Sequence, residues 1–92
     1  MADFLVEVYT SRLDGAALAK LVARLKAAAE AMSAEIPVTY LRSIHVPEDE
    51  TCFHLFEAES AEIVREAGRR AGLTFDRVAA AVEPVISEGG ER

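Results

Sequence analysis

Three stretches of the chain are rich in β-branched and aromatic side chains and predict strands. They are 4–9, in which apolar residues alternate with others, 38–46 and 51–57. The proline and acidic residues of 47–50 are typical of a turn, so we expect the second and third strands to pair as a hairpin. In 77–82 the alanines suit a helix, but the position and the two valines favour a fourth strand.

Two further stretches show the spacing of three and four residues that an amphipathic helix requires. In 15–32, apolar side chains recur at this spacing with charged side chains between them. Asp14 precedes this helix as an N-cap, because its carboxylate can accept from free backbone N–H groups. The second helix follows Ser60, also an N-cap, and ends before Gly72, since glycine adopts the positive φ of a helix end at little cost.

The predicted order is strand, helix, strand, strand, helix, strand, which is that of the ferredoxin-like βαββαβ fold. In this α+β fold, two helices cover one face of a four-stranded antiparallel sheet. A chain of 92 residues is long enough for one such domain. We place the domain at 1–86 and expect a flexible, polar C-terminal tail over 87–92.

Apolar side chains occupy both faces of the predicted strands, and they include Phe4, Phe53 and Leu55. A sheet with two apolar faces needs a cover on the face that the helices leave free. A second copy packed sheet to sheet, as in a dimeric α/β barrel, is the simplest cover. Scattered apolar surface residues are the alternative. We therefore expect a homodimer.

Charge and composition narrow the possible partners. The chain has 16 acidic and 10 basic residues, a net charge of −6, and no basic cluster longer than Arg69-Arg70. We therefore expect it to bind neither nucleic acid nor an anionic membrane surface. The longest apolar run, 78–82, is too short to span a bilayer, and the first residues do not resemble a signal peptide. The single cysteine, Cys52, fits a reducing compartment, so we expect a soluble, cytoplasmic protein.

Both histidines and the cysteine fall in the predicted hairpin. If the turn has an even number of residues, His45 faces Cys52, Ser43 faces His54, and all four share one face. An odd turn would place His45 and Cys52 on opposite faces. Two imidazoles and a thiol suit zinc, nickel or copper, although histidine and buried cysteine also fill ordinary cores. We take His45, Cys52 and His54 as candidate metal ligands.

A glycine in the middle of the second helix gives an alternative site. Gly68 costs up to about 1 kcal/mol relative to alanine, which indicates either close packing on the sheet or space for a ligand. In the second case Gly68, Tyr40, Phe53 and Leu55 would line a pocket for an apolar small molecule in a cofactor-independent enzyme. A cysteine–histidine nucleophile pair has no third group to orient it, so we name no catalytic residue.

Two stretches resemble a family of small actinobacterial domains whose structurally known example is described as a nickel-binding protein. One is 40–58, which includes Y-L-R-S-I-H-V-P and T-C-F-H-L-F-E-A, and the other is 60–78, with its A-G-L-T-F-D-R ending. The resemblance covers 4–82. It implies a ferredoxin-like fold and a homodimer, with nickel as a candidate metal.

The chain departs from this family at two positions. Gly68 stands where the family often carries a histidine, and Thr74 stands where it tends to have proline. The missing helix histidine weakens the transfer of metal binding, and His45 and His54 look like features of this sequence. Two functions therefore remain open besides a metal- or ligand-binding module. They are an enzyme similar to the dimeric α/β-barrel monooxygenases and cyclases, and a domain that binds another protein.

Overall fold

The predicted order of strands and helices is confirmed in residues 1–11 and 13–84, which the computed structural model describes. A short 3₁₀ turn, η1, joins the second and third strands. The elements are β1 (Ala2–Tyr9), α1 (Gly15–Met32), β2 (Val38–Val46), η1 (Pro47–Asp49), β3 (Thr51–Ala58), α2 (Ala61–Arg70) and β4 (Arg77–Ala81).

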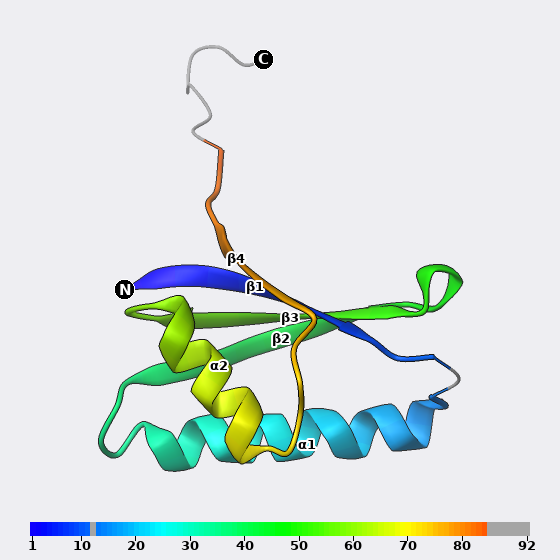
Figure 1. The fold of residues 1–92 in the computed structure, drawn as a ribbon, viewed down its shortest axis with the longest axis horizontal. Coiled ribbons are helices and arrows are strands. Elements are labelled where there is room, and N and C mark those ends of the chain that lie inside the picture. Colours follow the sequence, from blue (N-terminus) through cyan, green and yellow to red (C-terminus); the bar gives the residue numbers. More distant parts are fainter. Residues whose placement is uncertain (12, 85–92) are drawn as a thin grey trace.

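The strands form one antiparallel sheet in the order β2-β3-β1-β4. Both helices cover the same face of this sheet (Figure 1), as the ferredoxin-like prediction requires. The β2–β3 hairpin places Val46 opposite Thr51, so the even turn is confirmed. Glu50 closes that turn with a φ of 49°, and its carbonyl accepts from the Thr10 backbone N–H at 2.8 Å.

The predicted helix caps are confirmed by their hydrogen bonds. Asp14 Oδ1 accepts from the backbone N–H of Ala17 at 2.7 Å, and Ser60 Oγ accepts from that of Ile63 at 3.4 Å. Gly72 follows α2 with a φ of 79°, a conformation that costs a side chain much more than it costs glycine. These local signals fix where each helix begins and ends.

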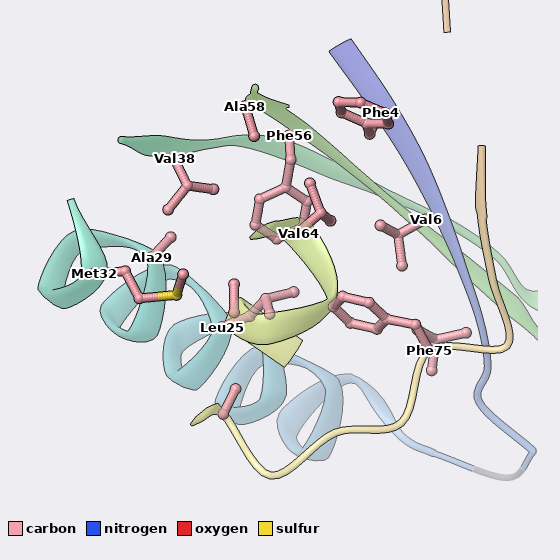
Figure 2. Packing of buried hydrophobic residues seen from close by; sticks show 13 residues of the cluster. Phe4, Val6, Leu25, Ala29, Met32, Val38, Phe56, Ala58, Val64 and Phe75 are labelled. Atoms are coloured by element: carbon pink, nitrogen blue, oxygen red, sulfur yellow. The ribbon is translucent and has the colours of Figure 1, made fainter. Parts of the chain in front are cut away.

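One apolar core lies between the sheet and the two helices (Figure 2). Strands contribute every second residue and helices contribute one stripe, as the two spacings predict. Burying one of the larger side chains stabilises the fold by about 1.5–3 kcal/mol. The buried cluster contains Phe4, Val6, Val8, Leu25, Ala29, Met32, Val38, Phe56, Ala58, Val64, Ala67, Ala71 and Phe75.

The alanine-rich last segment forms a strand, as its position predicted. β4 pairs with β1, and Val78 lies opposite Val6. Pairing along a central strand thus overrides the helix propensity of the alanines, because tertiary contacts outweigh local preference. The predicted tail, 87–92, and the end of the predicted domain, 1–86, lie outside the described residues. Neither α1 nor α2, the helices found in the described ranges, is long and apolar enough to cross a bilayer.

Gly68 is a position of close packing. A Cβ built on Gly68 would lie 2.7 Å from both Cε2 and Cζ of Phe75. Both residues are buried, and the Phe75 ring also packs at a tilt against Phe56, with ring centroids 6.3 Å apart. The ring therefore occupies the space in front of the glycine.

We expect Gly68→Ala to destabilise the domain, since the new methyl group must displace a buried ring. Overpacking costs about 1–3 kcal/mol and the gain in helix propensity is at most about 1 kcal/mol, so the net loss should be about 1–2 kcal/mol. Urea unfolding followed by circular dichroism measures this loss.

Gly15→Ala is the matched control. Like Gly68, Gly15 is a glycine in a helix, but an added Cβ at Gly15 would have no heavy atom within 4 Å. It should leave the unfolding free energy unchanged or slightly higher. A Phe75→Leu change should reduce the cost of Gly68→Ala in a double-mutant cycle. Equal costs in both backgrounds would contradict the packing explanation.

Candidate functional site

The polar residues of the predicted metal site lie on the hairpin of β2 and β3. His45 faces Cys52 and Ser43 faces His54 across the two strands. Cys52 and His54 are both buried, and they alternate with the outward-facing residues of β3. The prediction that these four residues share one face is therefore confirmed, and that face is the one covered by the helices.

His54 is the most enclosed polar side chain of the hairpin, with an exposed fraction of 0%. It lies on a central strand between Ser43 of β2 and Val6 of β1. Its Nδ1 is 2.6 Å from Ser43 Oγ, and that oxygen is 2.5 Å from Tyr40 Oη. A hydrogen-bonded chain thus leads from a half-buried phenol to the imidazole. Nε2 of His54 has no hydrogen-bond partner among the described residues.

A β-bulge in β2 makes this chain of hydrogen bonds possible. The register with β3 shifts between Tyr40 and Arg42, which leaves Leu41 as the extra residue. In a regular strand, side chains three residues apart point to opposite faces. The extra residue reverses this parity, so Tyr40 and Ser43 both lie on the helix side, where Tyr40 packs against the core.

His45 and Cys52 have separate surroundings. Nε2 of half-buried His45 is 3.4 Å from Thr10 Oγ1, and Cys52 Sγ donates a weak hydrogen bond to the Phe53 carbonyl at 3.9 Å. Across the part of the chain that the structure describes, no three His, Cys, Asp or Glu side chains lie close enough together to hold a metal ion. The hairpin aligns His45, Cys52 and His54 on one face without gathering their donor atoms.

Burial sets the protonation of the two enclosed groups. It lowers the pKa of His54 from 6.5 to about 4, because the interior penalises the charged imidazolium. It also raises the pKa of the Cys52 thiol. At neutral pH the imidazole is therefore neutral, as a metal ligand must be, whereas the thiol has to lose its proton before it can bind as a thiolate.

The four residues predicted for an apolar pocket do not line one cavity. Tyr40 lies on the helix side, while Phe53 and Leu55 lie on the opposite face of the sheet. The Phe75 ring fills the space in front of Gly68. The structure therefore places these side chains on two sides of the sheet.

Tyr40 does line a solvent-open pocket of about 240 Å³ between α1 and β2. Lys26, Glu30 and Ser33 are part of the same lining. This pocket is open to solvent and has charged side chains in its lining, so it differs from the enclosed apolar pocket that an enzyme acting on an apolar molecule would need.

The pairing of Tyr40 with Ser43 was not predicted from the sequence. The sequence does hold one signal for it. In a regular strand only residues an even number apart share a face, and Val38 and Tyr40 are an odd number of residues from Ser43 and His45. All four can face the helices only if the strand contains one extra residue between them. The position of that residue follows from pairing with β3, which the sequence does not give.

Comparisons with known proteins bear on the fold and on the family. The model of a family described as "Nickel responsive protein SCO4226-like" matches residues 8–80. The structure is similar to the crystal structure of SCO4226 from Streptomyces coelicolor A3(2), with a TM-score of 0.74 and 21% sequence identity over 91% of this chain and 100% of that chain. At this identity the structural likeness shows the fold alone. No curated protein sequence matches the chain.

We expect the metal-free domain to lose stability as the pH falls from 6.5 towards 4. The folded state holds His54 neutral down to about pH 4, whereas the unfolded chain takes up the proton near 6.5. The free energy of unfolding is therefore not reduced by His54 above pH 6.5, and about 3 kcal/mol of it is lost by pH 4. Urea unfolding at several pH values measures this loss. In His54→Gln, the part of the pH dependence of the unfolding free energy that comes from His54 should be absent. Equal pH slopes in the two proteins would contradict the assignment to His54.

Proposed function

This chain belongs to the nickel responsive protein SCO4226-like family, and from that premise we propose that it is a small, cytoplasmic, homodimeric protein that binds a divalent transition metal. Nickel is the first metal to test, because the family's description names it, and zinc is the second. The observation that carries the proposal is the Nε2 atom of His54, which is buried without a hydrogen-bond partner in the described part of the chain. A buried polar atom of this kind needs an explanation, and an ion is one.

The donors beside His54 have the right chemistry for such an ion. Imidazole and thiolate are the ligands that nickel, zinc and copper prefer over carboxylate and water. His45 and Cys52 share the helix-facing side with His54. Binding through all three would require His45 to give up its contact with Thr10 and Cys52 to lose its proton. Metal binding should therefore reorder the hairpin rather than fill a finished site.

A homodimer would cover the face of the sheet opposite the helices, which we call the open face. Its centre is largely apolar, since Leu55 of β3 lies beside Leu5 of β1 and Phe53 lies beside Ile44 of β2, although Glu7 of β1 lies on the other side of Phe53. Ile44 is 49% exposed.

Both signs of charge border this apolar centre. The acidic residues Glu57 and Asp3 lie opposite each other at one end, and Arg42 lies on the edge strand β2. A two-fold interface brings each residue against the same patch of the other copy, so a surface with an apolar centre and mixed charges can be complementary to itself.

The enzyme alternative has less support. Phe53 and Leu55 lie on the open face, and Phe75 occupies the expected space at Gly68. Neither observation favours a pocket for an apolar substrate between the helices and the sheet.

Calorimetric titration of tag-free protein with nickel, zinc and copper tests the metal proposal. We expect one site with a Kd near 1 μM, which corresponds to about −8 kcal/mol. His45→Ala/His54→Ala should abolish this heat because it removes both imidazoles of the chain.

Val6→Ala is the matched control for the titration, because Val6 is a buried cross-strand neighbour of His54 but has no donor atom. It should lose stability and keep the metal affinity. The absence of heat for all three metals with the unmodified protein would exclude the proposed site.

Light scattering after size-exclusion chromatography tests the dimer. The unmodified chain should elute with twice its own mass, and Leu55→Glu should elute as a monomer because it places a charge in the centre of the open face. Ala27→Glu puts the same charge on an exposed position of α1 and should remain dimeric. A monomeric unmodified protein would contradict this part of the proposal.

A further inference from the structure

We infer that the hydroxyl groups of Tyr40 and Ser43 hold His54 in one tautomer, with the proton on Nδ1, so that Nε2 carries a free lone pair towards the interior. Its use as a metal-binding nitrogen rests on the proposed function, whereas the tautomer does not. Tyr40 and Ser43 are then positioning residues, which act on the ion only through His54.

The geometry fixes one end of the imidazole. Ser43 Oγ lies 2.6 Å from Nδ1 of His54 and 2.5 Å from Tyr40 Oη. Because a single hydroxyl carries one proton, Ser43 can donate to only one of these two neighbours. Two arrangements are therefore available, and they differ in which ring nitrogen of His54 carries the proton.

In the first arrangement Tyr40 donates to Ser43 and Ser43 donates to Nδ1, which forces the proton of the neutral ring onto Nε2. That places an N–H group in the interior with no acceptor among the described residues. Unpaired buried N–H groups are rare in proteins and cost more than an acceptor left without a donor. This arrangement is therefore the unfavourable one.

In the second arrangement Nδ1 donates to Ser43 and Ser43 donates to Tyr40, whose own proton then points elsewhere. Tyr40 is only half-buried and lines a solvent-open pocket, so water can accept that proton. Each donor among Tyr40, Ser43 and His54 then has an acceptor, which for Tyr40 is water. Nε2 is left without a partner among the described residues, and it is now unprotonated with a free lone pair.

The same arrangement occurs around metal-bound histidines in general. A ligating histidine almost always donates its second ring N–H to a fixed acceptor, which sets the tautomer and the ring orientation. Here Ser43 is that acceptor. The bulge at Leu41 brings Tyr40 onto the same face as Ser43 and His54, so the hydrogen bonds that set the tautomer depend on the bulged backbone.

Long-range ¹H–¹⁵N correlation spectra at pH 7 test the tautomer, because protonated and unprotonated ring nitrogens have well-separated ¹⁵N shifts. In the metal-free protein, Nδ1 of His54 should be protonated and Nε2 unprotonated. The decisive variant is Tyr40→Phe, which keeps the edge-on ring packing against Phe56. Without the phenol oxygen, the Nδ1–H tautomer leaves the Ser43 hydroxyl without an acceptor and the Nε2–H tautomer leaves Nε2–H without one among the described residues, so the preference for Nδ1 should weaken and the fraction of His54 protonated on Nε2 should rise.

Two variants of Ser43 complete the test. Ser43→Ala removes the acceptor of the Nδ1 proton, so the ratio of the two tautomers should fall about five- to tenfold, as expected for one lost hydrogen bond. Ser43→Thr retains a hydroxyl and should keep the original tautomer. A proton on Nε2 in the unmodified protein, or a spectrum that does not change in Tyr40→Phe, would overturn the inference.

Nickel titration of the same variants separates the two claims. If the proposed function holds, Tyr40→Phe should weaken nickel binding about tenfold and Ser43→Thr should not. If the unmodified protein gives no heat with nickel, the metal proposal fails, while the spectra still decide whether Tyr40 and Ser43 set the tautomer. Equal nickel affinity in Tyr40→Phe and the unmodified protein, together with a shifted tautomer, would overturn the role of His54 as the ligand.

Discussion

A neutral imidazole enclosed in the core is the constraint on which the hairpin depends. An unsatisfied buried polar atom costs about 1–3 kcal/mol, in a domain whose total stability should be about 5–15 kcal/mol. His54 recovers part of this cost through Ser43, and Ser43 in turn bonds to Tyr40. Within residues 1–11 and 13–84, the remaining cost falls on Nε2, which leaves one ring nitrogen of the hairpin buried without a hydrogen-bond partner.

The bulge in β2 connects this constraint to the rest of the fold. Without the extra residue at Leu41, a strand that keeps Val38 and Tyr40 in the core would turn Ser43 away from His54. With it, one strand supplies apolar packing at its first half and polar partners at its second half. The bulge interrupts backbone hydrogen bonds only between β2 and β3, because β2 is an edge strand with no neighbour on its other side among the described strands.

Much of this arrangement could be predicted from the sequence because its signals are local. Asp14 and Ser60 mark the helix starts by their own hydrogen bonds, and the even turn after Val46 sets which residues face each other. The bulge and the link from Tyr40 to Ser43 could not be predicted, since they depend on how two strands align. The same holds for Phe75, which reaches Gly68 only through packing between segments.

The pair of Gly68 and Phe75 also limits where a metal can be held. The family that the chain resembles often carries a histidine at the position of Gly68, but here any side chain at that position would meet the Phe75 ring. A ligand from α2 at this position would therefore require a smaller side chain at residue 75. Both histidines of the chain lie in the hairpin instead, so any imidazole that binds an ion must come from β2 or β3. Of these two, His54 is the one whose second ring nitrogen is buried without a hydrogen-bond partner among the described residues, while its first contacts the Ser43 hydroxyl.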